Sequence, residues 1–104
     1  RGHAIECRIY AEDCKQNFMP STGAISALAL PIGSNIRVDA DINLGFEISA
    51  FFDPMIAKIT TYGATREQAI ACMRDALKKS FLAGPTTNIS FLEAITKSYE
   101  FING

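Results

Sequence analysis

Three polar side chains with possible chemistry share one face of the opening stretch. In an extended chain alternate residues point to opposite sides, so Glu6, Arg8 and Tyr10 lie together, about 7 Å apart from one to the next. The residues between them are small or apolar and can face a core. An arginine held on a rigid strand is suited to recognising an anion or a developing oxyanion. The alternative is an exposed face with an ordinary ion pair, and composition alone favours that alternative.

Asp53 is a second candidate because of its neighbours. It follows two phenylalanines and precedes Pro54, and a carboxylate in apolar surroundings needs a partner. An arginine of the first strand is a plausible one. The other carboxylates are best interpreted as surface charge.

Other kinds of site find little support. The single histidine, His3, has no neighbouring His or Cys with which to bind a metal, and one histidine alone does not indicate a Ser/His/Asp triad. No glycine-rich phosphate loop occurs. Cys7, Cys14 and Cys72 are an odd number without CxxC spacing, which fits reduced thiols in a cytosol-like compartment. Cys7 is expected to face inward as a buried neutral thiol.

Length and composition indicate one globular domain. The chain has 104 residues, of which 48% are hydrophobic and 20% charged, and a net charge of −1. That balance gives no reason to expect nucleic acid or an anionic membrane as a partner. No apolar run approaches the ~20 residues of a membrane span, and no secretory signal is visible. A domain of this size is short for a complete enzyme, and a start at Arg1 within a strand pattern predicts a piece of a longer polypeptide.

The hydrophobic pattern predicts strands first and helices afterwards. Turn-forming residues interrupt five short apolar or alternating stretches, for which tight connections favour an antiparallel sheet. These stretches cover residues 1–13, 24–30, 36–42, 46–50 and 55–62. In the loop between the first two, Phe18 and Met19 are expected to pin the loop onto the body.

The pattern then changes to a helical period. Thr65 and Gln68 have capping-box spacing, and an apolar stripe runs through Ile70, Met73, Leu77 and Phe81 before a stop signal at residues 84–85. A second helix is expected to begin with Asn88 as N-cap and to bury Ile89, Leu92 and Ile95. The predicted fold class is α+β: an antiparallel β-sheet of about five short strands followed by two C-terminal helices packed on it.

A resemblance to a known family extends over nearly the whole chain. Residues 1–13, read Arg-Gly-His-Ala-Ile-Glu-Cys-Arg-Ile-Tyr-Ala-Glu-Asp, closely resemble the C-terminal domain of biotin carboxylase, which follows the ATP-grasp module in biotin-dependent carboxylases. The match continues in order and with near-constant spacing through residues 17–23, 36–39, 52–59, 65–70 and 87–92. The resemblance implies that residues 1–104 are one such domain, with an ATP-grasp module expected upstream.

The resemblance also implies a reaction and its participants. ATP activates bicarbonate, and the carboxyl group passes to N1 of biotin on a carrier protein, within an acyl-CoA carboxylase or a related enzyme. Arg8 matches the family's catalytic arginine, which lies against the ureido oxygen of biotin. We assign Glu6 and Asp53 to orienting Arg8. The cofactors implied are biotin, together with ATP and Mg bound mainly by the upstream module.

The expected partners are the upstream module, the biotin carboxyl carrier domain and a carboxyltransferase subunit or domain. The full-length protein is expected to be an oligomer in the cytoplasm, or in the mitochondrial matrix if eukaryotic. The isolated 104 residues are expected to be inactive. An alternative function is a non-catalytic structural or assembly domain of a carboxylase subunit; retention of Arg8 with its flanks argues against it. An ATP-grasp relative of the carbamoyl-phosphate or glycinamide type is a third class, and its C-terminal segments lack the run around Arg8.

The sequence departs from the family pattern in two places. Cys14 stands where the family usually has proline. In the homodimer of the free-standing enzyme, an arginine at the position of Arg37 pairs with a helix carboxylate, whereas the matching helix position here is Lys79. Arg37 and Lys79 are therefore the candidate interface residues. Tyr10 and the Asp53–Pro54 pair are more similar to acyl-CoA carboxylase α-subunits than to the free-standing enzyme.

Overall fold

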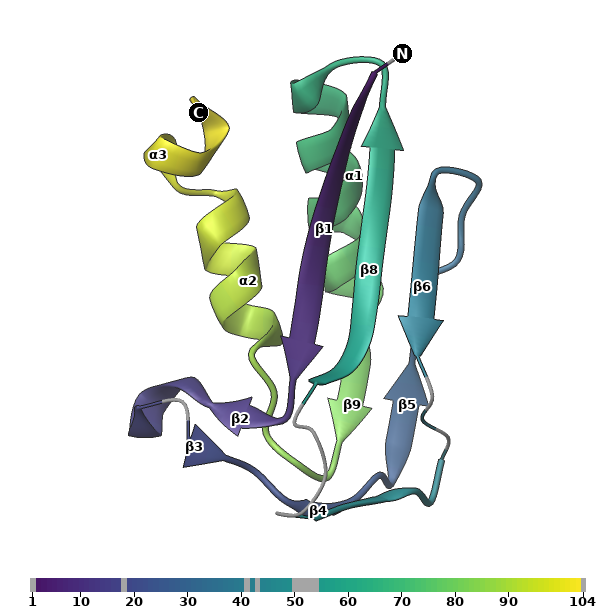
Figure 1. The fold of residues 1–104 in the computed structure, drawn as a ribbon, viewed down its shortest axis with the longest axis vertical. Coiled ribbons are helices and arrows are strands. Elements are labelled where there is room, and N and C mark those ends of the chain that lie inside the picture. Colours follow the sequence, from purple (N-terminus) through teal and green to yellow (C-terminus); the bar gives the residue numbers. More distant parts are fainter. Residues whose placement is uncertain (1, 18, 41, 43, 50–54, 104) are drawn as a thin grey trace.

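The computed structural model describes residues 2–17, 19–40, 42, 44–49 and 55–103. Figure 1 shows the long strands side by side, with short strands below them and helices behind and to one side. The elements in chain order are β1 (His3–Tyr10), β2 (Glu12–Asp13), a 3₁₀ turn (Cys14–Gln16), β3 (Met19–Pro20), β4 (Gly23–Ala24), β5 (Ala27–Ala29), β6 (Ile36–Ala40), β7 (Glu47–Ile48), β8 (Met55–Gly63), α1 (Arg66–Lys79), β9 (Phe81–Ala83), α2 (Ile89–Thr96) and α3 (Tyr99–Ile102).

A three-stranded antiparallel sheet in the order β1-β8-β6 positions the opening stretch. β1 pairs with β8 from His3 opposite Gly63 down to Tyr10 opposite Met55, and the register shifts between Ile9 and Tyr10. Such a shift is a bulge, which disrupts the ladder locally and re-aims the strand. α1 lies behind β1 and β8 in Figure 1, so one face of the sheet is covered.

The core forms between this covered face and the apolar stripe of α1. Its buried members come from both layers, because strands alternate with period two and helices with period 3.6. They include Ile9, Ile56, Ile59, Met73 and Leu77, none more than 6% exposed. The predicted alternation of β1 and the predicted stripe of α1 are confirmed at these positions.

Local hydrogen bonds explain where α1 begins. The Thr65 side chain accepts from the backbone N–H of Gln68 at 3.2 Å, and the Gln68 side chain accepts from the N–H of Ala64 at 2.9 Å. The Thr65 bond satisfies one N–H that the first turn leaves without a helical partner, and the Gln68 bond holds the N–H of the residue before the N-cap. The predicted capping by Thr65 is therefore confirmed, with the reciprocal Gln68 bond shifted to Ala64, one residue before the N-cap.

The end of α1 differs from the prediction. The helix ends at Lys79, and Phe81 begins β9 and is 56% exposed, so its placement on the buried stripe was wrong. The physical cause lies at Ser80, whose backbone is extended and whose hydroxyl donates back to the carbonyl of Ala76 at 2.8 Å. Extended backbone after this bond leads straight into the pairing of Phe81 with Ala29 of β5.

The α+β class is confirmed, but the strands form several separate sheets and not one continuous sheet. In the described part of the chain, three two-stranded ribbons accompany the three-stranded sheet: β2-β3, β4-β7 and β5-β9. The expected strand 24–30 is divided between β4 and β5. Met19 lies in β3 and is 60% exposed, so the expectation that it pins its loop was wrong; Phe18 lies outside the described residues.

Two arginines of α1 hold the C-terminal helices in place. Arg74 donates from Nε and Nη2 to the carbonyl of Thr96 at 3.1 and 2.9 Å, at the end of α2. Arg66 donates to the carbonyl of Phe101 at 2.7 Å and lies 4.9 Å from the centre of its ring. Because terminal helix carbonyls lack partners within the helix, these bonds satisfy them while fixing α2 and α3 beside α1. The second predicted helix is thus confirmed, and the short α3 is an addition to it.

Among the described residues, no helix combines the length and the apolar character that crossing a membrane requires.

Candidate functional site

The central feature of the site is the Arg8–Glu6 pair on β1. The Arg8 Nε–H donates to Glu6 Oε2 at 2.8 Å, within charge-assisted hydrogen-bond range. Their side chains are 57% and 38% exposed, whereas Cys7 and Ile9 on the opposite face are buried at 8% and 2%. The buried face of β1 therefore anchors the strand in the core, and the opposite face exposes the Arg8 guanidinium.

Hydrogen bonding reinforces the positive charge that the Arg8 guanidinium already carries at neutral pH. The bond to Glu6 raises the pKa of Arg8 above its ordinary value, and hydrogen bonding to Tyr10 raises it further. A guanidinium carries five N–H donors in a fixed fork. The Glu6 bond occupies the Nε–H, so the fork retains donors for Tyr10 and for an anionic ligand. All three side chains that the alternation placed on one face are thus brought together.

Asn88 holds the backbone of β1 at the same place. Its side-chain oxygen accepts from the N–H of Tyr10 at 2.7 Å, and its side-chain nitrogen donates to the carbonyl of Arg8 at 3.1 Å. The prediction that Asn88 is the N-cap residue of α2 is confirmed by its position, although its side chain makes no cap hydrogen bond. The amide is instead committed to β1, and the nearby Thr87 hydroxyl accepts from the N–H of Ile89 at 3.4 Å.

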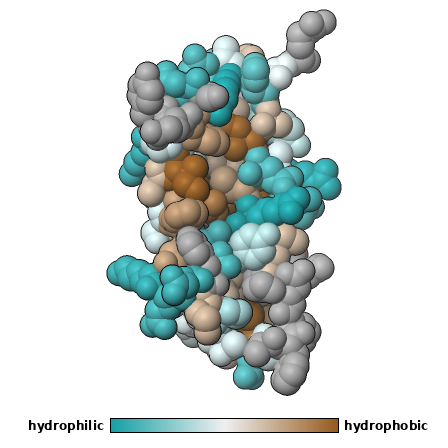
Figure 2. All heavy atoms as spheres, turned by 60° about the vertical axis from the view of Figure 1, so that its left-hand side comes forward, coloured by the Kyte–Doolittle hydropathy of each residue, from teal (hydrophilic) through white to brown (hydrophobic). Residues whose placement is uncertain are grey.

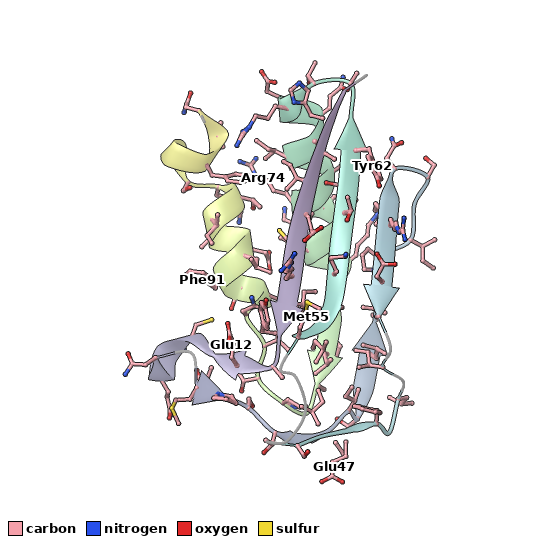
Figure 3. All side chains as sticks on the ribbon, viewed as in Figure 1. Glu12, Glu47, Met55, Tyr62, Arg74 and Phe91 are labelled. Carbon is pink, nitrogen blue, oxygen red and sulfur yellow. The ribbon has the colours of Figure 1, made fainter. Side chains whose placement is uncertain are left out.

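A groove of about 390 Å³ separates β1 from α2 and α3, and Arg8 and Asn88 border it. Figure 2 turns this side of the molecule forward and shows apolar residues gathered on it, with hydrophilic residues beside them. In Figure 3, Phe91 from α2 and Glu12 from β2 lie on this side, one above the other. The apolar lining comprises Ile5, Phe91, Leu92, Ile95 and Phe101. The prediction that Ile89, Leu92 and Ile95 face inward is confirmed as far as half-burial.

The two interface candidates, Arg37 and Lys79, lie on other elements than Arg8. Arg37 on β6 donates from Nε to Asp39, with oxygens at 3.2 and 3.4 Å. Lys79 pairs with Asp75 one helical turn earlier at 2.9 Å. Each interface candidate therefore has a carboxylate partner on its own element. Asp53, the second supporting residue, lies outside the described residues.

Lys58 of β8 was not among the predicted site residues, yet the sheet places it next to Arg8. It is the cross-strand partner of Arg8 on one side and of Asp39 on the other. Directly opposed side chains in a sheet are close enough to interact. The register thus puts a carboxylate beside Lys58 on the side away from Arg8. Only the pairing of β1 with β8, which no local pattern encodes, could have indicated this.

The cysteines and histidine show no metal-binding arrangement in the described part of the chain, where no three His, Cys, Asp or Glu side chains gather closely enough to hold an ion. Burial, and then the charge of Glu6, raises the pKa of Cys7 to about 11. The prediction that Cys7 faces inward as a neutral thiol is therefore confirmed.

Comparisons with known proteins agree with one another. The family described as "Biotin carboxylase C-terminal domain" matches residues 6–104. Biotin carboxylase 1 of Bacillus subtilis is 44% identical over 103 residues, which are 99% of this chain and 23% of that protein. The mitochondrial methylcrotonoyl-CoA carboxylase subunit alpha of Glycine max is 38% identical over 99% of this chain and 14% of its own length.

Solved structures show the same fold. The biotin carboxylase domain dimer of the Hydrogenobacter thermophilus 2-oxoglutarate carboxylase, in complex with MgADP, ADP and bicarbonate, superimposes with a TM-score of 0.97 at 39% identity. The similarity covers 99% of this chain and 23% of that one. The chain therefore spans less than a quarter of the length of these relatives.

Proposed function

Because this chain belongs to the biotin carboxylase C-terminal domain family, we propose that it is one part of an enzyme that uses ATP and bicarbonate to carboxylate N1 of biotin on a carrier protein. We further propose that Arg8 is its catalytic residue. The observation that carries this proposal is the geometry of β1, where an anchored strand presents a cationic, partly exposed guanidinium held by Glu6.

The proposed reaction requires a fixed positive charge beside the ureido oxygen of biotin. Biotin supplies N1 as the acceptor of the carboxyl group. When N1 loses its proton, negative charge spreads onto the neighbouring ureido oxygen, and Arg8 would donate hydrogen bonds to that oxygen as an oxyanion hole does. Glu6 would hold the fork in direction through the Nε–H. A lysine could not reproduce this arrangement, because it lacks the planar fork.

The nucleotide and metal would be held elsewhere in the full-length protein. The described residues contain no cluster suited to a metal ion, whereas the 2-oxoglutarate carboxylase relative was solved with MgADP. We therefore assign ATP and Mg to an upstream ATP-grasp module. Asp53 stays a proposed support for Arg8.

The remaining partners follow from the same reading. They are a biotin carboxyl carrier domain and a carboxyltransferase subunit or domain. The relative's dimer supports an oligomer here too, with the Arg37 and Lys79 surfaces as proposed contacts, in the cytoplasm or the mitochondrial matrix.

The decisive experiment replaces Arg8 in the full-length enzyme. Arg8→Ala is expected to slow transfer of radiolabelled bicarbonate to biotin by roughly 10²- to 10³-fold, the usual cost of one lost oxyanion donor. Bicarbonate-dependent ATP cleavage without biotin should fall far less, because that step precedes contact with the ureido group. Arg8→Lys should recover little of the loss. Unchanged biotin carboxylation in Arg8→Ala would show that the domain has a structural or assembly role instead.

A further inference from the structure

Asn88 occupies the outer edge of β1 in the manner of a strand residue. Its side chain is joined to two backbone groups of β1, and its own backbone N–H donates to the carbonyl of Tyr10 at 3.2 Å. The residue is only 5% exposed. Three hydrogen bonds from one residue therefore close the edge of β1 over Arg8 and Tyr10, on the side away from β8.

The position of these bonds coincides with the weak point of the β1–β8 ladder. The register shifts between Ile9 and Tyr10, and a bulge leaves ladder groups unpaired and lets the strand bend. Without support from the other edge, the direction of the Arg8 side chain would follow that bend. Asn88 supplies the support within one residue of the bulge on either side.

We propose that Asn88 is a positioning residue for Arg8. By fixing the Arg8 carbonyl and the Tyr10 N–H, it sets the direction in which β1 projects the guanidinium. This inference rests on the proposed function of Arg8. Only a side chain with a donor and an acceptor side by side can make both bonds: a carboxylate lacks the donor, and an aliphatic side chain lacks both. Misplacement of a catalytic group by about 1 Å can cost 10²-fold in rate.

Two substitutions in the full-length enzyme separate the two bonds. Asn88→Asp can still accept from the Tyr10 N–H but sets a carboxylate against the Arg8 carbonyl, and Asn88→Ala removes both bonds. We expect biotin carboxylation to fall roughly tenfold in the first variant and up to about 100-fold in the second. Biotin-independent ATP cleavage should stay within about twofold, because Arg8 is not engaged in it.

Ser80→Ala is the matched control. Ser80 is similarly buried, at 8% exposed. The substitution removes one side-chain hydrogen bond, which the Ser80 hydroxyl donates to the carbonyl of Ala76 in α1 and not to β1. It should lower stability while leaving the ratio of biotin carboxylation to ATP cleavage unchanged. If Asn88 only stabilises the domain, its variants will behave like Ser80→Ala, with both activities falling together, and the inference is overturned.

Combination with Arg8→Ala shows whether Asn88 acts through Arg8. When Asn88→Asp is added to Arg8→Ala, carboxylation should fall no further, because residues in one network are not additive. A further tenfold fall would contradict the inference and leave the role of Arg8 intact. Full activity in Arg8→Ala alone would instead refute the proposed function, and the positioning role with it. If Asn88→Ala fails to fold, Asn88→Asp decides the outcome.

Discussion

The two outer strands of the three-stranded sheet carry nearly the same local motif. β1 has Glu6 and Arg8, and β6 has Arg37 and Asp39, in each case a carboxylate and an arginine two residues apart. Both pairs involve the arginine Nε, at 2.8 Å in β1 and 3.2 Å in β6, and both arginines are more than half exposed. By the ion pair alone, the two strands are hard to tell apart.

The support behind the pairs is different. On β1 the residues that flank Arg8, Cys7 and Ile9, are buried, and Asn88 closes the free edge. On β6 the corresponding residues, Ile36 and Val38, are only half-buried. Within the described ranges, no hydrogen bond joins the outer edge of β6 to a further strand.

This contrast shows what distinguishes a candidate catalytic arginine from an ordinary surface pair. An exposed ion pair contributes little by itself, because solvent screens it and its side chains lose entropy. An arginine on a fixed backbone can contribute more to catalysis, because a preorganised donor needs no reorganisation at the moment of reaction. Matched substitutions on β1 and β6 therefore test how much this support matters.

The largest difference is expected from the anchoring residues. Ile9→Ala in the 104-residue chain should lower the free energy of unfolding by about 2–5 kcal/mol, because Ile9 is 2% exposed and its truncation leaves a cavity. Ile36→Ala is the matched change on β6 and should cost about half as much or less, since solvent already reaches that side chain. Urea unfolding followed by circular dichroism measures both. Equal losses would mean that the two edges are equally well anchored.

The next difference concerns the thiol behind Arg8. With its pKa raised from 9.0 to about 11, Cys7 should carry roughly 100-fold less thiolate than an unperturbed cysteine at neutral pH, because each pKa unit is a factor of ten. Alkylation by iodoacetamide, read by mass spectrometry, should therefore modify the half-buried Cys14 and Cys72 before Cys7. Modification of Cys7 as rapidly as Cys14 would indicate that β1 opens readily.

The same pKa gives a pH dependence of stability. The folded state favours the neutral thiol, so the Cys7 contribution is fully present below about pH 9 and is lost as the pH rises toward about 11. Urea midpoints should fall over that window in the native chain, and should fall less in Cys7→Ala.

The sequence carried enough information for the parts of the fold that local periodicity determines. Alternation placed Cys7 and Ile9 inward and Arg8 outward, and the capping box located the start of α1. Local periodicity could not show that the chain leaves α1 at Ser80 and continues as β9. That outcome depends on a strand partner, β5, which lies about fifty residues earlier in the chain.

In the candidate site, too, contacts within one strand could be predicted, whereas contacts between distant segments could not. Glu6 and Arg8 are two residues apart, so their contact follows from the geometry of one strand. Asn88 was assigned to the nearest helix because asparagine favours N-caps, but β1, about eighty residues away in the sequence, takes both ends of its amide. Lys58 joins the site for the same reason, through strand register. Long-range pairing of this kind leaves no local pattern.

The smallest expected difference tests the carboxylates themselves. Glu6→Gln keeps an acceptor for the Arg8 Nε–H but removes its charge, and a charge-assisted hydrogen bond is roughly twice as strong as a neutral one. In the full-length enzyme, biotin carboxylation should fall roughly tenfold, as the guanidinium spends less time in the productive direction. Asp39→Asn makes the same change beside Arg37 and should stay within about twofold of the native rate. Because both pairs are solvent-exposed, neither substitution should alter stability appreciably. Equal losses of activity in the two variants would mean that the net charge of the sheet face matters, and not the orientation of Arg8 by Glu6.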